Sequence, residues 1–176
     1  MMLCAPFSYR AVRALLPGAL AALPLAAVAA VYTSGSNTVP FDVTLQILAN
    51  CVVAANPLNF GSSQGVVTTA VAVNTTISVT CSNNTPYNLG LNAGTGAGST
   101  TATRYMSGTG ANTAAVQYTL SQSAGAANWG NTQGSDTLAG TGTGTTQTLT
   151  VYGKIPPQNT PVPDTYTSTV TATVYF

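Results

Sequence analysis

One short segment of this chain alternates apolar and polar side chains without interruption, from residue 39 to residue 47. Successive side chains of a β-strand point to opposite faces, so the pattern predicts a strand with one apolar face. The last eleven residues, 166–176, alternate in the same way. Chain ends usually fray unless a sheet holds them, so two patterned ends indicate that strand pairing there is part of the function. The apolar positions are Val39, Phe41, Val43, Leu45 and Ile47 in the first segment, and Val170, Ala172, Val174 and Phe176 in the second.

The first 30 residues have the features of a cleaved export signal. Arg10 and Arg13 precede an apolar stretch from Ala14 to Val28, and small residues follow where a signal peptidase would cut. Prolines interrupt the stretch and disfavour a retained membrane helix, and no other segment is long and apolar enough to span a bilayer. We therefore expect residues 1–30 to be removed on export to the periplasm.

Two cysteines, Cys51 and Cys81, remain after the leader. In an exported protein such a pair predicts a disulfide. A metal site is the alternative, but the sequence has no His and no Glu to complete one. We expect no metal and no cofactor.

The remaining chain is predicted to be all-β. No ten-residue stretch keeps the apolar period of a helix, whereas alternation recurs between turn residues. The many short strands and the disulfide favour an immunoglobulin-like β-sandwich. From Ser121 to Thr146 we expect long loops with one short strand, anchored by Trp129. Strands are predicted near residues 51–54, 66–73, 77–81, 87–91, 104–106, 116–120, 148–155 and 166–176. These suffice for a sandwich, so Val39–Ile47 is surplus to it or forms its first strand.

The composition argues against several function classes. Without its leader the chain has two basic residues and three aspartates, a net charge of −1, so nucleic acid and anionic membranes are poor partners. No His can activate the hydroxyls, and the aspartates are scattered singly, so no catalytic residues can be assembled. One alternative is a carbohydrate-binding module that stacks sugars on Trp129, Tyr105, Tyr118 and Tyr152, although buried structural roles fit these aromatic residues better.

Several short motifs resemble, in order, the spore coat protein U domain family, which includes pilins of archaic, Csu-type chaperone-usher pili. The resemblance covers essentially the whole chain after the leader. It implies an incomplete immunoglobulin-like sandwich, completed by a strand donated by a chaperone or by a neighbouring subunit. The matching motifs are residues 57–61, 78–81, 104–106, 116–118, 129–130 and 151–155, together with the threonine-rich C-terminus.

The same resemblance implies partners and roles. A periplasmic chaperone would bind first, and at the outer-membrane usher the next subunit, identical or related, would replace it. Residues 31–48 would be the donor extension, inserting Val39, Phe41, Val43, Leu45 and Ile47, and residues 49–176 the pilin domain. The C-terminal strand would contact the chaperone and flank the groove. The predicted function is a surface pilus subunit serving adhesion or biofilm formation.

Two alternatives remain open, and the chain departs from the family pattern at one position. A structural coat protein of spores or fruiting bodies would share the family, and donation could stop before Leu45 if that residue joins its own sheet. Family members often carry Gly before the aromatic residue of the final strand, whereas this chain has Asp164 before Thr165 and Tyr166. Asp tolerates left-handed backbone geometry, which would keep the turn. The chain's length favours a shaft or adaptor subunit over a two-domain tip adhesin.

Overall fold

The computed structural model describes residues 35–62 and 67–176. The chain divides after Val43 into two units, and each is described by itself. The predicted export signal, residues 1–30, and Val66 lie outside the described residues.

All regular secondary structure in the described part of residues 44–176 is β-strand, which confirms the predicted all-β class. Because no helix occurs among the described residues, none is long and apolar enough to cross a membrane. The strands are β1 (Cys51–Ala55), β2 (Val71–Cys81), β3 (Pro86–Leu91), β4 (Arg104–Ser107), β5 (Ala115–Ser121), β6 (Leu138–Thr141), β7 (Thr146–Ile155) and β8 (Ala172–Tyr175).

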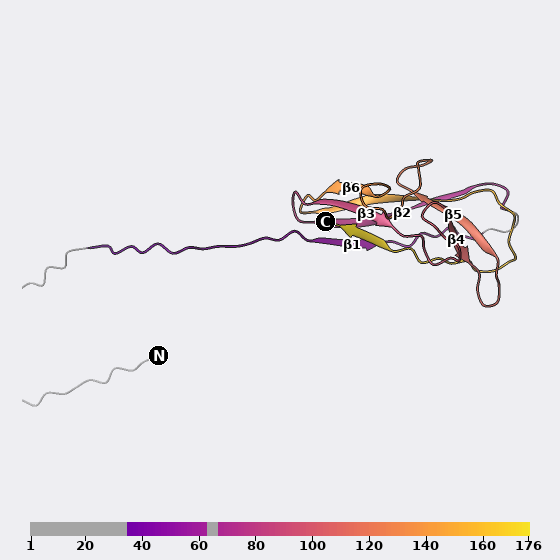
Figure 1. The fold of residues 1–176 in the computed structure, drawn as a ribbon, viewed down its shortest axis with the longest axis horizontal. Coiled ribbons are helices and arrows are strands. Elements are labelled where there is room, and N and C mark those ends of the chain that lie inside the picture. The colour runs from indigo at the N-terminus through magenta and orange to yellow at the C-terminus, as the bar shows by residue number, and fades with distance from the viewer. Residues whose placement is uncertain (1–34, 63–66) are drawn as a thin grey trace, which may run out of the picture. The chain divides into compact units, whose positions relative to one another are not determined.

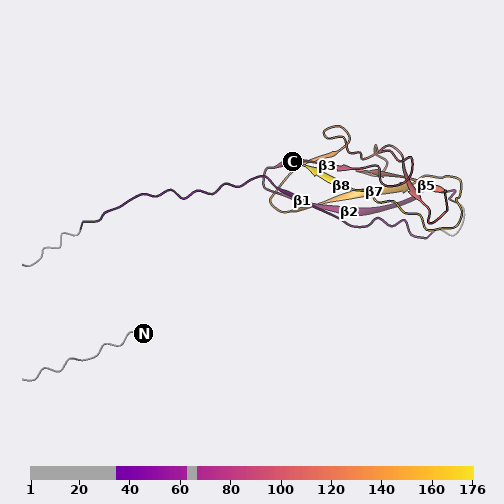
Figure 2. The same ribbon diagram turned by 60° about the horizontal axis from the view of Figure 1, so that its bottom comes forward.

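The strands form two antiparallel sheets (Figures 1 and 2). The larger sheet has the order β1-β2-β7-β5-β4 and the smaller one the order β6-β3-β8. The long pair β2 and β7 runs from Val71 opposite Ile155 to Thr80 opposite Thr146. Strand β8 pairs with β3 on one side only, so it is an edge strand of the smaller sheet.

Alternation places every second side chain of these strands in a common core between the sheets. On β5, for example, Val116, Tyr118 and Leu120 are buried while the residues between them face outward. The buried apolar residues are Ile77, Val79, Cys81, Tyr87, Leu89, Leu91, Val116, Tyr118, Leu120, Trp129, Val151 and Ile155. The core therefore uses residues from both sheets, as expected for a sandwich.

The disulfide joins the first two strands. Cys51 lies directly opposite Cys81 at the start of β1, and the two sulfur atoms are bonded. Cys81 is 2% exposed and faces the core beside Val79, as the alternation predicted.

Two strand predictions need correction. The run predicted at 66–73 belongs to a strand only from Val71 onward, and from there it continues without a break through the run predicted at 77–81 to form β2, because β7 pairs with β2 from Val71 to Thr80. Residues 67–70 form no strand. The final strand predicted at 166–176 narrows to β8, Ala172–Tyr175, because β3 ends at Leu91 and offers no ladder partner further along. The short strand expected between Ser121 and Thr146 is β6.

No strand forms in the described residues 35–50 of the single chain. The apolar side chains of this alternating segment are 78 to 85% exposed. A β-strand needs a neighbouring strand that bonds its N–H and C=O groups. Alternation predicts which face of the segment will be buried, but it does not predict which strand will pair with it.

Candidate functional site

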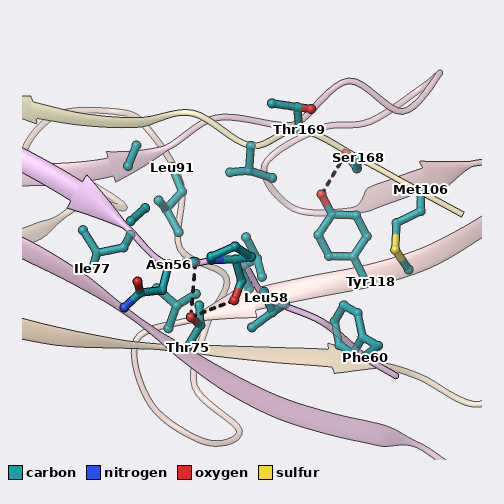
Figure 3. A pocket seen from close by; sticks show the side chains of 16 residues that line it. Asn56, Leu58, Phe60, Thr75, Ile77, Leu91, Met106, Tyr118, Ser168 and Thr169 are labelled. Atoms are coloured by element: carbon teal, nitrogen blue, oxygen red, sulfur yellow. Dashed lines mark hydrogen bonds between the residues drawn. The ribbon is translucent and has the colours of Figure 1, made fainter. Parts of the chain in front are cut away.

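A groove of about 520 Å³ opens into the core of residues 44–176 (Figure 3). Its base consists of apolar side chains from the larger sheet. Two chain segments flank it, residues 55–60 and residues 168–172. The base residues are Ile77 of β2, Val151 of β7, Tyr118 and Leu120 of β5, and Met106 of β4, with Leu91 of β3.

The first wall follows β1. Leu58 and Phe60 fold over Gly153, where an added Cβ atom would lie 2.5 Å from Leu58 Cδ2. The Thr75 hydroxyl donates to the carbonyls of Asn56 and Pro57, at 3.2 and 3.0 Å. A glycine is thus required on β7 so that this segment can lie close to the sheet, which links the motifs at 57–61 and 151–155.

The second wall is the chain before β8, and its backbone is bonded on one side only. The backbone of Thr167 exchanges two hydrogen bonds with Ser107. Thr169 N donates to Thr95 Oγ1 at 3.0 Å, and Thr171 N donates to Asn92 Oδ1 at 2.9 Å. Among the described residues, the backbone groups of Ser168 and Val170 have no hydrogen-bond partner. Because N–H and C=O directions alternate along a strand, this wall presents an open strand edge to the groove.

One end of the groove has a polar link between base and wall. The Tyr118 hydroxyl donates to Ser168 Oγ at 3.0 Å (Figure 3). Thr95 N donates to the same oxygen at 3.2 Å. Phe60 meets Tyr118 edge to face, with ring centroids 6.3 Å apart. The aromatic rings and this link bound the groove here.

A buried arginine positions the second wall. Arg104 is fully buried and donates four hydrogen bonds to backbone carbonyls. The acceptors are Asn92 O from Nε and Thr101 O from Nη1, each at 2.9 Å, and Leu91 O and Trp129 O from Nη2, at 2.9 and 2.6 Å. Burial lowers the pKa of the guanidinium, while Tyr118 and Asp136 act in the opposite direction. The group stays charged and fixes Asn92, whose side chain holds Thr171.

The alternating N-terminal segment is first attached to the sandwich at Leu48. Ser82 N donates to Asn50 O at 2.9 Å, and Asn50 N donates to Ser82 Oγ at 3.1 Å. The Ser82 hydroxyl also donates to Leu48 O at 3.4 Å. Leu45 and Ile47, just before this attachment, are 84 and 78% exposed.

The structure distributes the residues predicted for function as follows. Val170 and Ala172 line the groove, Val174 packs against the core, and Phe176 is 58% exposed beyond β8. Sequence reasoning did not find the roles of Arg104, Asn92, Leu58 and Phe60. Arg104, Leu58 and Phe60 lie in motifs that resemble the family, but the motifs did not indicate what these side chains do. Asn92 lies in none of the motifs.

Asp164 accepts hydrogen bonds instead of adopting left-handed geometry, which corrects the expectation for this turn. Asn84 is the only described residue other than glycine with a positive φ. The Asp164 carboxylate accepts from Thr109 Oγ1, Asn112 Nδ2, Thr109 N and Thr165 N, at 2.6 to 2.7 Å. These bonds hold the pKa of the exposed carboxyl well below its usual range.

Other chemistry finds little support in the described residues. No three side chains of His, Cys, Asp or Glu gather there as metal ligands. Trp129 is fully buried with its Nε1 donating to Leu89 O at 2.7 Å, and Tyr118 is 3% exposed. These two rings cannot stack sugars on the surface, which removes half of the predicted platform. The arrangement fits the uptake of an extended apolar segment.

Comparison with known proteins gives a family model and solved structures. The model of the Spore Coat Protein U domain matches residues 37–173. No curated protein sequence matches the chain. Of 15 matching chains in solved structures, one lies in the crystal structure of the CsuC-CsuE chaperone-tip adhesion subunit pre-assembly complex from archaic chaperone-usher Csu pili of Acinetobacter baumannii. It has a TM-score of 0.55 and 24% sequence identity, and the match covers 74% of this chain and 40% of that one. This likeness supports the fold.

Proposed function

This chain belongs to the Spore Coat Protein U domain family, and from that premise we propose that it is a structural subunit of a chaperone-usher pilus. It is exported to the periplasm, held there by a pilus chaperone, and passed to an outer-membrane usher. It then polymerises by donor-strand exchange into a surface fibre that serves adhesion or biofilm formation. It acts as a building block and carries out no catalysis.

One observation carries the proposal: the groove and the alternating segment complement each other. The groove has an apolar base and one open strand edge at residues 168–172. The segment 39–47 has an exposed apolar face and no strand partner among residues 35–62 and 67–176. An extended segment that enters the groove would satisfy both, because it covers the base and pairs with the open edge.

The energetics suit a stable joint. Burying five large apolar side chains contributes roughly 8 to 15 kcal/mol before the cost of ordering the segment. Backbone hydrogen bonds along the open edge add to this. A subunit whose groove stays exposed to water lacks this stabilisation, so a chaperone strand is needed until the next subunit arrives.

The test is deletion of residues 35–47, which keeps the export signal and the attachment at Leu48. We expect the shortened subunit to reach the periplasm and bind its pilus chaperone, but to form no fibres with the usher. Its groove is intact, so it should still accept the segment of a wild-type subunit and should then be found only at the first position of a fibre. A matched control replaces the polar positions Thr44 and Gln46 by Ser and Asn and should assemble normally. Normal fibres from the deletion variant would refute the proposal.

A further inference from the structure

We infer the register in which the segment of a second copy of this chain fills the groove. With the segment antiparallel to the C-terminal wall, Val43 lies opposite Val170 and Phe41 opposite Ala172. The inference rests on the proposed function, in which the segment comes from another subunit, and adds to it the pairing of individual residues.

The orientation follows from which ends of the strands lie together. Cys51 is opposite Cys81 and Tyr175 is opposite Asn88, and β2 leads into β3 through the short turn 82–85. The start of β1 and the C-terminus are therefore at the same end of the sandwich, as both ribbon views show (Figures 1 and 2). From that end β1 runs away, whereas the C-terminal strand runs toward it.

Chain direction then distinguishes a strand inserted from the same chain from a strand inserted by another copy. A segment attached to its own sandwich at Leu48 would enter its own groove from this end with Ile47 first. It would run parallel to the C-terminal wall. Every ladder in both sheets is antiparallel, and antiparallel pairs are the more common and slightly more stable kind. An antiparallel insert must come from another copy.

The register follows from faces and sizes. Four wall residues line the groove, Ser168, Thr169, Val170 and Ala172, and the two apolar ones, Val170 and Ala172, are both even-numbered. Residues directly opposite in a ladder share a face. The apolar residues of the segment must therefore lie opposite even-numbered residues of the wall. The wall that lines the groove is centred on Val170, and the segment is centred on Val43. Pairing the two centres puts the largest side chain, Phe41, opposite the small Ala172, and Leu45 opposite Ser168.

The outer face of this register is polar, as a solvent-facing surface should be. Asp42 would lie opposite Thr171, and Thr44 opposite Thr169. Since the backbone groups of Thr171 face β3, the pair of Asp42 and Thr171 is of the non-hydrogen-bonded kind, with Cα atoms about 4.5 Å apart. That distance is within reach of a disulfide, whereas diagonal neighbours are too far apart.

The test uses two variants that each add one cysteine to the Cys51–Cys81 pair, Asp42→Cys and Thr171→Cys, expressed together with chaperone and usher. A disulfide between positions 42 and 171 then joins different copies by construction. We expect cross-linked dimers on non-reducing gels, with the joined peptides identified by mass spectrometry. Matched controls pair Asp42→Cys with Thr169→Cys or Thr173→Cys, which are shifted by two residues, and should give several-fold less dimer.

A size swap tests the register without cysteines. Ala172→Leu should fill the space for the Phe41 ring and sharply reduce fibre yield, while secretion and chaperone binding continue. Phe41→Ala in the same chain should restore assembly, whereas Val43→Ala should not. Fibres that cross-link best through a control pair, or fibres rescued by the wrong partner, would overturn the register and leave the proposed function standing. Failure of wild-type subunits to form fibres would refute the proposed function itself.

Discussion

The N-terminal segment 39–47 and the C-terminal segment 166–176 both need neighbouring strands, and only the second has one. β8 pairs with β3, and the residues before it are tied to Ser107, Thr95 and Asn92. The first segment has no ladder with any described part of the chain, and its apolar side chains are 78 to 85% exposed. Alternation predicts that one face of a segment will be buried, but sheet order determines which strand buries it. In this sheet order one edge of β8 is left without a partner strand. Four changes can break or sharpen this contrast.

The largest effect is expected from Arg104→Met, which should loosen the C-terminal segment and leave the N-terminal one unaffected. Four carbonyls lose a charged donor in a buried site, and two of them belong to Leu91 and Asn92, next to the wall of the groove. Charge-assisted hydrogen bonds contribute about 1.5 to 3 kcal/mol each, so we expect the free energy of unfolding to fall by at least about 3 kcal/mol. Denaturant unfolding of the chaperone-free subunit measures this.

Lys154→Met is the control for this substitution, because Lys154 is an exposed cation on β7. It should change stability by less than about 0.5 kcal/mol. Equal effects of the two substitutions would show that the hydrogen bonds of Arg104 do not hold the wall.

Replacing Cys51 and Cys81 together by Ala should have the next largest effect. The disulfide closes a loop with a sequence separation of 30, for which the chain-entropy model gives about 3 to 4 kcal/mol. It lies just after the attachment of Leu48 and Asn50 to Ser82. We therefore expect hydrogen exchange to rise in β1 and residues 48–50 and to remain fast in residues 39–47, where no ladder protects the amides.

A matched pair, Val174→Ala and Val43→Ala, tests the contrast directly. Val174 packs against the core of its own subunit, so its truncation should lower the stability of the unassembled subunit by about 1 to 2 kcal/mol. Val43 is 83% exposed and should leave that stability unchanged. In fibres we expect Val43→Ala to be destabilising, because we propose that Val43 is buried in a neighbouring subunit there. The substitution should lower the denaturant midpoint of depolymerisation. An unassembled subunit destabilised equally by both would contradict the donor role.

Much of the fold could be predicted because its signals are local. The strands at 51–54, 87–91, 104–106, 116–120 and 148–155 appear within a residue or two of their predicted positions. The disulfide was predicted from the two cysteines of an exported chain, and its inward face from alternation around Cys81. Residue patterns also predicted Trp129 as the anchor of the loop region, since no other side chain there is as large.

The groove could not be predicted residue by residue because its parts meet only in three dimensions. Gly153 and Leu58 are brought together by the path of the chain after β1, and Arg104 takes its acceptors from three separate parts of the chain. The start of β8 depends on where β3 stops, and β2 is continuous only because β7 is long. None of these relations leaves a periodic trace in the sequence.

The smallest effect concerns the start of the C-terminal segment and depends on pH. Asp164 accepts four hydrogen bonds as a carboxylate, which lowers its folded-state pKa below the ordinary value of 3.8. A carboxyl whose pKa is lower in the folded state stabilises the fold above its unfolded pKa, and this stabilisation is lost as pH falls through the folded value. Wild type should thus be slightly more stable than Asp164→Asn at pH 7, and the difference should shrink once the pH falls below about 4. Denaturant midpoints measured across that range test this, with Asp42→Asn as the control, because Asp42 lies in the exposed N-terminal segment and should show no difference at either end. A gap between wild type and Asp164→Asn that stays constant with pH would mean that the turn before the final strand is held by the shape of the side chain and not by its charge.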